Sequence, residues 1–201
     1  MRKALLVVGV QNDLCCPEGA SAVPDGDRVA PRISAVGSAV DHAGDLVIAA
    51  REWLPPDTES FANGRLAPYC VAGTSGAAFH PGLQLSRRTR QVLRYVDPEE
   101  NGHSAFLAVA RDASPLEDLL RVADVEEVFL GGLPLENAIR ATAMDALRRG
   151  FGVTVLQDCV AARDPQAGRD VLTSLRLAGA RVTSSGEAIL SLYKSGEARL
   201  D

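Results

Sequence analysis

Six short apolar runs alternate along the 201-residue chain with segments whose apolar positions recur every three or four residues. The runs lie at 4–10, 46–50, 91–96, 126–131, 152–157 and 180–183. They are apolar on both faces, which is typical of strands covered by helices on each side. The pattern therefore predicts an α/β fold, a doubly wound three-layer sandwich around a central parallel six-stranded sheet.

The segments between the runs carry helix start and stop signals. Asp27 is expected to cap a helix that ends at Gly44, and Asp164 to cap one that ends at Gly179. Ser114 followed by Pro115 predicts a capping box. The first helix is expected to face the core with Val29, Ile33, Val36 and Val40. A later helix, which starts near residue 136, is expected to face it with Ile139, Ala143 and Ala146.

Residues 51–89 do not follow the alternation. They are rich in Pro, Gly and Ala, and we expect a long excursion over the carboxyl ends of the strands that forms a pocket wall. Nothing in the composition resembles a linker, so residues 1–201 are interpreted as a single domain.

The charge balance restricts the class of partner. A net charge of −5 and a pI near 5.3 argue against nucleic acid or an anionic membrane. The first apolar run ends at Gln11 without a cleavage site, and no stretch approaches the ~20 apolar residues of a membrane span. The four cysteines show no Cys-x-x-Cys spacing, so reduced thiols and a cytoplasmic protein are expected.

The ligand site of such a fold lies beyond the carboxyl ends of the central strands. That rule selects Gly9 to Asp13, Glu52 onward, Arg94 and the turn at 132–138. The turn leads into a helix N-terminus, whose free N–H groups suit an anion. The first helical residues, however, are Glu136, Asn137, Ala138 and Ile139, with no Ser, Cys or His among them.

Five segments in order resemble successive motifs of the nicotinamidase/isochorismatase-like cysteine hydrolases. They are VVGVQNDLCCPEGASAVPDGD, REWLPPDTESF, YCVAGTSGAAFHP, HSAF and GGLPLENAIRATAMDALRRGFGVTVLQDCVAARD. The resemblance runs from about residue 3 to residue 185. It implies the same fold, and it implies an Asp–Lys–Cys triad in active members.

The triad positions implied by the resemblance hold other residues. Gly9 stands in place of the Asp, Arg94 in place of the Lys, and Ala138 in place of the nucleophilic Cys. Alanine cannot attack a carbonyl, glycine cannot accept a proton, and arginine keeps its proton near neutral pH. The inherited mechanism is therefore expected to be lost.

Nicotinamidases also hold a metal through an Asp and several His residues. The matching positions here are Glu52, Leu54, Thr58 and Tyr69. A transition-metal site needs converging imidazoles, thiolates or carboxylates. We therefore expect no metal and no other cofactor.

Other residues offer alternatives to the triad. Cys15 and Cys16 follow the first strand, and a structural role is favoured for both. Ser104 and His103 are neighbours that point to opposite sides of an extended segment. Glu52 and Glu136 are a candidate acid–base pair, with solvated or salt-bridged carboxylates as the favoured alternative. Asp13 is expected to cap or brace the loop after the first strand.

Three functional hypotheses follow. The first is a catalytically silent protein with a pocket for a small carboxylate or aromatic amide. Its anion would lie between Arg94 and the helix N-terminus, and its pocket candidates are Gly9, Leu14, Glu52, Trp53, Leu54, Pro134, Leu135, Glu136, Asn137 and Ala138. The second is a structural or regulatory subunit that pairs with another protein, and the third a hydrolase with a rewired site.

Two further expectations concern assembly and the turn. The resemblance implies a homodimer or homotetramer. A cis peptide bond is predicted between Leu133 and Pro134, where proline lowers the cost of the cis form. Whether Arg94 points into the pocket or pairs with Glu52 or Glu136 stays open at this point.

Overall fold

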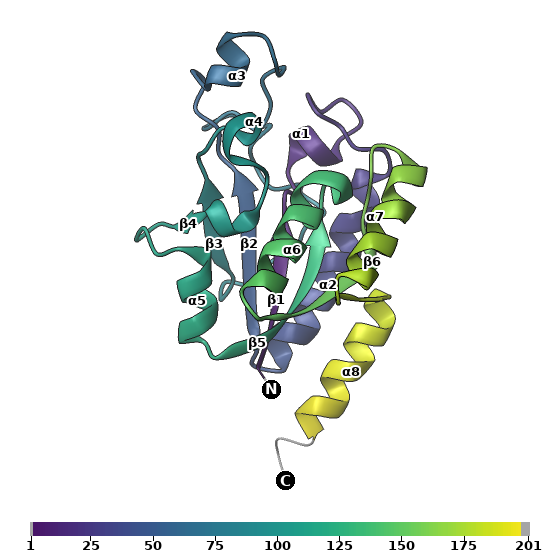
Figure 1. Cartoon of the computed structure of the whole chain (residues 1–201). Coiled ribbons are helices and arrows are strands. Elements are labelled where there is room, and N and C mark those ends of the chain that lie inside the picture. Colours follow the sequence, from purple (N-terminus) through teal and green to yellow (C-terminus); the bar gives the residue numbers. More distant parts are fainter. Residues whose placement is uncertain (1, 198–201) are drawn as a thin grey trace.

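The computed structural model describes residues 2–197. Their strands form one seven-stranded sheet (Figure 1). The strand order is β4-β3-β2-β1-β5-β6-β7, and every neighbouring pair is parallel except β3 and β4. The strands are β1 (Arg2–Val8), β2 (Leu46–Glu52), β3 (Arg90–Arg94), β4 (Val109–Ala110), β5 (Val125–Gly132), β6 (Gly152–Val160) and β7 (Arg181–Thr183).

The sheet differs from the sequence prediction in strand number and strand ends. The expected parallel six-stranded sheet gains β4, an antiparallel strand of two residues, which is too short to leave an apolar pattern. The first strand was expected to reach residue 10 but ends at Val8, because Gly9 leaves the extended region with φ +66°. The third was expected to reach residue 96 but ends at Arg94.

The helices follow the predicted order, with different starts. The longer ones are α2 (Val29–His42), α5 (Leu116–Val122), α6 (Arg140–Arg148), α7 (Pro165–Leu177) and α8 (Ser185–Glu197). The shorter segments are α1 (Asn12–Cys15), η1 (Gly26–Arg28), α3 (Glu59–Ala62), α4 (Pro98–Asn101), η2 (Ala105–Leu107) and η3 (Leu135–Ile139).

One predicted cap is confirmed and two are wrong. The Asp164 carboxylate accepts hydrogen bonds from the backbone N–H groups of Gln166 and Ala167, which caps α7. Asp27 lies inside η1 instead of preceding α2. Ser114 makes no side-chain cap because α5 begins one residue later than expected, after Pro115.

Helices cover both faces of the sheet, as the three-layer prediction requires. Helices α5, α6 and α7 pack on one face, and α2 and α8 on the other (Figure 1). The predicted core positions of α2 and of the η3–α6 segment are buried: Val29, Ile33, Val36, Val40, Ile139, Ala143 and Ala146. Helix α8 was not predicted, and it packs through Ala188 and Leu192.

The excursion after β2 rises beyond the carboxyl ends of the strands, where α3 lies above β2 and β3 (Figure 1). A bridge between Leu54 and Val71 joins it to the residues directly after β2, and a bridge between Gln11 and Phe79 joins it to the segment after β1. These ties place the excursion beside the ends of β1 and β2. No helix within residues 2–197 is long and apolar enough to cross a membrane.

Candidate functional site

Glu52 and Arg94 form an ion pair at the carboxyl ends of β2 and β3. The two residues are register partners across the strands, so their side chains emerge side by side on the same face. Arg94 Nε donates to Glu52 Oε1 at 3.0 Å, and Arg94 Nη2 donates to Glu52 Oε2. Arg94 is 2% exposed and Glu52 7%. Arg94 therefore pairs internally, one of the orientations that the sequence left open.

The remaining donor group of Arg94 is also occupied by the protein. Arg94 Nη1 donates to the carbonyl oxygens of Val96 at 3.1 Å and Gly102 at 2.8 Å. Burial raises the pKa of Glu52, and the charge and hydrogen bonds of Arg94 act against that rise. The guanidinium thus has acceptors on all three nitrogens and is held in one orientation.

Gln11 is a site residue that the sequence reasoning did not single out. Its Nε2 donates to the carbonyl oxygens of Glu52 at 2.8 Å and Ala77 at 2.9 Å, and its Oε1 accepts from Glu52 N–H at 2.8 Å. The side chain is fully buried. Gln11 therefore clamps the end of β2 to the excursion. The available signal was its place in the Val-Gln-Asn-Asp run.

Gly9 occupies a place without room for a side chain. It follows β1 with φ +66°, and its N–H donates to Ala50 O at 3.0 Å. A Cβ atom there would lie 2.5 Å from Leu133 O and 3.2 Å from Leu14 Cδ1. The backbones after β1 and β5 are in contact at the point where the resemblance places a carboxylate.

The turn after β5 has the expected cis peptide bond between Leu133 and Pro134. It continues into η3, a single π-type turn, whose Leu135 N–H donates to Ala161 O at 2.9 Å. The N–H groups of Glu136, Asn137 and Ala138 belong to the first turn and have no intrahelical acceptor. The structure thus retains a helix N-terminus that can donate to a carbonyl oxygen or an anion.

His103 lies next to this turn, because its Nε2 is 3.4 Å from Asn137 Nδ2. Burial and the charge of Arg94 lower the pKa of His103, so the imidazole is neutral near pH 7. Its neighbour Ser104 caps η2 by accepting from Phe106 N–H. The two adjacent residues therefore have separate structural partners.

Glu136 is held by a partner other than Glu52. Its Oε1 accepts from Arg163 N–H at 2.9 Å, while its Oε2 is buried without a hydrogen-bond partner. The Arg163 guanidinium donates in turn to Ser21 O and Ala22 O. Glu52 is salt-bridged, as the favoured alternative to an acid–base pair has it, whereas Glu136 accepts from a backbone N–H group and is neither salt-bridged nor fully solvated.

The apolar wall candidates are packed tightly. Four of them expose at most 3% of their surface: Leu14, Leu54, Leu135 and Ala138. Pro134 is also buried, whereas Trp53, Glu136 and Asn137 are partly exposed. Trp53 is stacked against the Arg51 guanidinium, 4.5 Å from its ring centroid. The surface that these candidates offer to a ligand is therefore mainly that of Trp53, Glu136 and Asn137.

The four positions matched to metal ligands do not provide a transition-metal donor set. Both Glu52 oxygens accept hydrogen bonds from Arg94, and Leu54 has no donor atom. The Thr58 hydroxyl donates to Pro55 O at 2.6 Å, and Tyr69 packs edge-on against Phe61. Within residues 2–197 no group of three or more His, Cys, Asp or Glu is arranged to hold a metal ion.

The cysteines are free thiols, and three of the four are buried. Burial raises the pKa of Cys15 and of Cys159 to about 12 and also raises that of Cys70. A thiol with so high a pKa is a poor nucleophile near neutral pH.

Asp13 braces the loop after β1, as expected. Its carboxylate accepts from Cys70 N–H at 2.6 Å and from Ala20 N–H at 3.3 Å. The bond to Cys70 joins this loop to the excursion.

Comparison with known proteins agrees with the motifs. The isochorismatase domain model matches residues 3–187. The chain is 30% identical over 190 residues to the nicotinamidase/pyrazinamidase of Mycobacterium tuberculosis, covering 91% of this chain and 99% of that protein. It is 25% identical over 176 residues to an Arabidopsis thaliana protein named "Probable inactive nicotinamidase", covering 81% of this chain and 82% of that protein.

A solved structure shows the same fold. The pyrazinamidase of Pyrococcus horikoshii, solved in complex with zinc, superposes with a TM-score of 0.82 at 30% identity, covering 92% of this chain and 99% of that chain. The domain match spans nearly the whole sequence, and the motifs meet at one end of the sheet. This chain belongs to the isochorismatase family.

Proposed function

We propose that this protein is a catalytically silent member of the isochorismatase family. The buried Glu52–Arg94 ion pair is the observation that carries the proposal. Triad hydrolysis needs a thiolate that attacks, a carboxylate that moves the proton and a cation that orders them. Ala138 and Gly9 supply neither of the first two, and Arg94 directs its donors at acceptors within the protein.

Three of the four thiols are poorly suited to take over the reaction. Cys15, Cys70 and Cys159 are buried thiols with raised pKa values, so they stay protonated near neutral pH. The relative from Arabidopsis thaliana is named "Probable inactive nicotinamidase", and we propose an inactive state for this chain. These points argue against a hydrolase with a rewired site.

The ligand that best fits the remaining site is a small, neutral aromatic amide. The Glu52–Arg94 pair has no net charge, and a carboxylate ligand would compete with Glu52 for the same guanidinium. A carbonyl oxygen instead needs only N–H donors, which the first turn of η3 retains. The partly exposed His103 and Asn137, whose side-chain nitrogens lie 3.4 Å apart, offer polar groups. An amide is therefore preferred to a carboxylate.

Two measurements test this proposal with nicotinamide as the probe. Ammonia release should not exceed that of a mock purification, although an active nicotinamidase in the same assay releases it. Nicotinamide should raise the melting temperature saturably and nicotinate should do so less, since a ligand at 100 times its Kd stabilises by about 2.7 kcal/mol. Asn137→Ala should reduce the shift, and Asn63→Ala, which alters an exposed loop, should not.

Catalytic silence is wrong if ammonia release scales with protein concentration and disappears in Glu52→Gln or Cys15→Ser. That result would establish the rewired hydrolase. Equal shifts in wild type and Asn137→Ala would instead reject the amide pocket while leaving silence untouched.

A second candidate function is that of a structural or regulatory subunit. It is favoured by α8, where Leu190 and Tyr193, three residues apart on one face, are 63% and 55% exposed. We propose that this face joins copies of the chain in a homodimer or homotetramer. Light scattering should give a multiple of the 21.2 kDa chain mass, and Leu190→Asp should reduce it. A monomeric wild type would reject the homo-oligomer but not a role in which the chain pairs with a different protein.

A further inference from the structure

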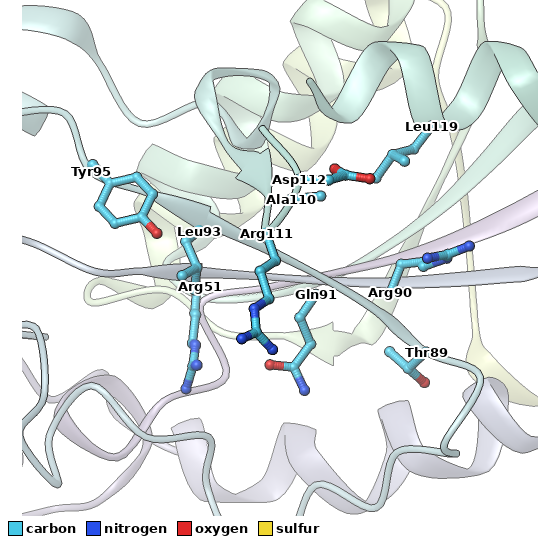
Figure 2. A pocket seen from close by; sticks show the side chains of 10 residues that line it. All are labelled: Arg51, Thr89, Arg90, Gln91, Leu93, Tyr95, Ala110, Arg111, Asp112 and Leu119. Atoms are coloured by element: carbon cyan, nitrogen blue, oxygen red, sulfur yellow. The ribbon is translucent and has the colours of Figure 1, made fainter. Parts of the chain in front are cut away.

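A hollow of about 740 Å³ lies at the β3–β4 edge of the sheet and does not include the Glu52–Arg94 pair (Figure 2). Its volume is within the range of small-molecule sites. The lining residues come from β2, β3, β4 and α5 and from the segments next to the strands: Arg51, Thr89, Arg90, Gln91, Leu93, Tyr95, Ala110, Arg111, Asp112 and Leu119.

The hollow wraps around β3, so strand alternation divides its lining between the two faces of the sheet. Along β2 and β3, side chains alternate between the face that holds Glu52 and Arg94 and the face covered by α2. The α2 face receives Arg51, Gln91 and Leu93. Arg111 lies two residues after Val109, the register partner of Leu93. Figure 2 shows the ends of Arg51, Arg111 and Gln91 pointing to the same side of the strands.

This side of the hollow carries uncompensated positive charge. The lining has one carboxylate, Asp112, whose pKa is lowered by hydrogen bonds from Ser114 and by the charge of Arg90. Among residues 2–197 no carboxylate forms an ion pair with Arg51 or Arg111. Two guanidinium groups therefore face one space on a chain whose net charge is −5.

Two polar atoms in the wall have no partner in the protein. Arg51 Nε and Thr89 Oγ1 are two of the three buried side-chain polar atoms without a hydrogen bond in the described part of the chain. Buried polar atoms are nearly always paired with protein, water or a ligand, and these two belong to residues that line one hollow. The Arg51 guanidinium is also held in position, 4.5 Å from the Trp53 ring centroid and 5.0 Å from that of Phe79.

We propose that this hollow binds the phosphate group of a small molecule between Arg51, Arg111 and Gln91. The planar fork of arginine matches phosphate oxygens, and two guanidinium groups match the double charge of a phosphomonoester. The half-buried Leu93 and the Tyr95 ring, which is 47% exposed, flank the same space and offer apolar surface to the organic part. The site is separate from the silent triad region.

Calorimetric titration with inorganic phosphate, adenosine monophosphate and adenosine tests the proposal. Both phosphates should bind saturably and adenosine should not. Tighter binding of the monophosphate identifies an organic phosphate as the ligand, whereas equal affinity identifies free phosphate. Arg111→Gln should weaken phosphate binding about 10- to 100-fold, the usual effect of losing a charged hydrogen bond.

Two further variants separate binding from folding. Arg51→Lys keeps the charge and loses the planar fork, so it should weaken binding less than Arg111→Gln does. Arg148→Gln removes an exposed arginine from α6, outside the hollow, and should leave binding unchanged. Equal phosphate affinity in wild type and Arg111→Gln would overturn the proposal. The proposal would also be wrong if phosphate does not bind and the protein self-associates in a way that Arg111→Gln abolishes. That result would identify the hollow as a contact between copies of the chain.

Discussion

Glu52 and Arg94 are register partners on adjacent parallel strands, and their side chains form an ion pair that solvent hardly reaches. By the resemblance of the motifs, these two positions are expected to match a metal-binding carboxylate and a catalytic lysine. The carboxylate accepts hydrogen bonds from two nitrogens of the guanidinium, and the carbonyl oxygens of Val96 and Gly102 accept from the third. The ion pair therefore belongs to the buried interior of the protein.

Replacing one member of this pair should destabilise the fold strongly. Arg94→Met leaves a buried, unpaired carboxylate and should lower the free energy of unfolding by about 3–5 kcal/mol. Urea denaturation measures this loss. Adding Glu52→Gln to Arg94→Met should recover part of the loss, because the unpaired charge is then removed.

The matched control is Arg148→Met, which removes an ion pair from a side chain that is 68% exposed. Its cost should stay below about 1 kcal/mol. Equal costs for Arg94→Met and Arg148→Met would show that the buried pair has no special role in stability.

Most of the fold could be predicted because buried positions recur at regular intervals in the sequence and hold apolar residues. Strands covered on both faces appear as apolar runs, and α2 shows its core face at Val29, Ile33, Val36 and Val40. Strand β4 has only two residues and therefore no period. The start of α2 was misplaced because the chain enters it through the turn η1, in which Asp27 has no capping contact.

The sequence selected candidate positions for the site but not the contacts between them. Motif positions identified Gly9, Glu52, Arg94 and Ala138, yet Glu52 and Arg94 are 42 positions apart. Their contact depends on the register of β2 against β3, which neither strand specifies alone. The same holds for Gln11, whose clamp on Glu52 exists only once the excursion is in place.

Gly9→Ala should destabilise the protein by more than the strain of its backbone alone. Its Cβ would lie 2.5 Å from Leu133 O, so the backbones after β1 and β5 must separate. Gly44→Ala is a matched control, since Gly44 has φ +74° and a Cβ atom there would meet nothing within 4 Å. The control should cost about 1–2 kcal/mol and Gly9→Ala about 1–3 kcal/mol more.

Because a side chain at residue 9 meets the Leu133 carbonyl, introducing the three triad residues together should not produce hydrolysis. A variant with Gly9→Asp, Arg94→Lys and Ala138→Cys still faces the Leu133 carbonyl at residue 9. Ammonia release from nicotinamide should stay at the background of the assay. Turnover by a folded triple variant would show that the backbone adapts and that only side chains were lost.

The thiols should differ sharply in reactivity. Cys16 is half-buried, whereas Cys15, Cys70 and Cys159 are buried and have raised pKa values. With a disulfide reagent at pH 8 the native protein should show one fast thiol, and Cys16→Ser should abolish that phase. Cys15→Ser should leave it intact. A fast phase that follows Cys15 instead would reopen its candidacy as a nucleophile.

The stability of the protein should fall as the solution is acidified through the titration range of His103. Burial and Arg94 lower the pKa of His103 in the folded state below its ordinary value of 6.5. The unfolded chain therefore takes up this proton first, and stability that is present above pH 6.5 is lost as the pH falls toward the folded pKa.

One such group contributes a slope of at most about 1.4 kcal/mol per pH unit. Urea denaturation between about pH 7.5 and 5.5, about one unit above and below that value, should show the loss. His103→Asn should reduce it, whereas His42→Asn, at an exposed position on α2, should not. An unchanged slope in His103→Asn would mean that another group carries the pH dependence.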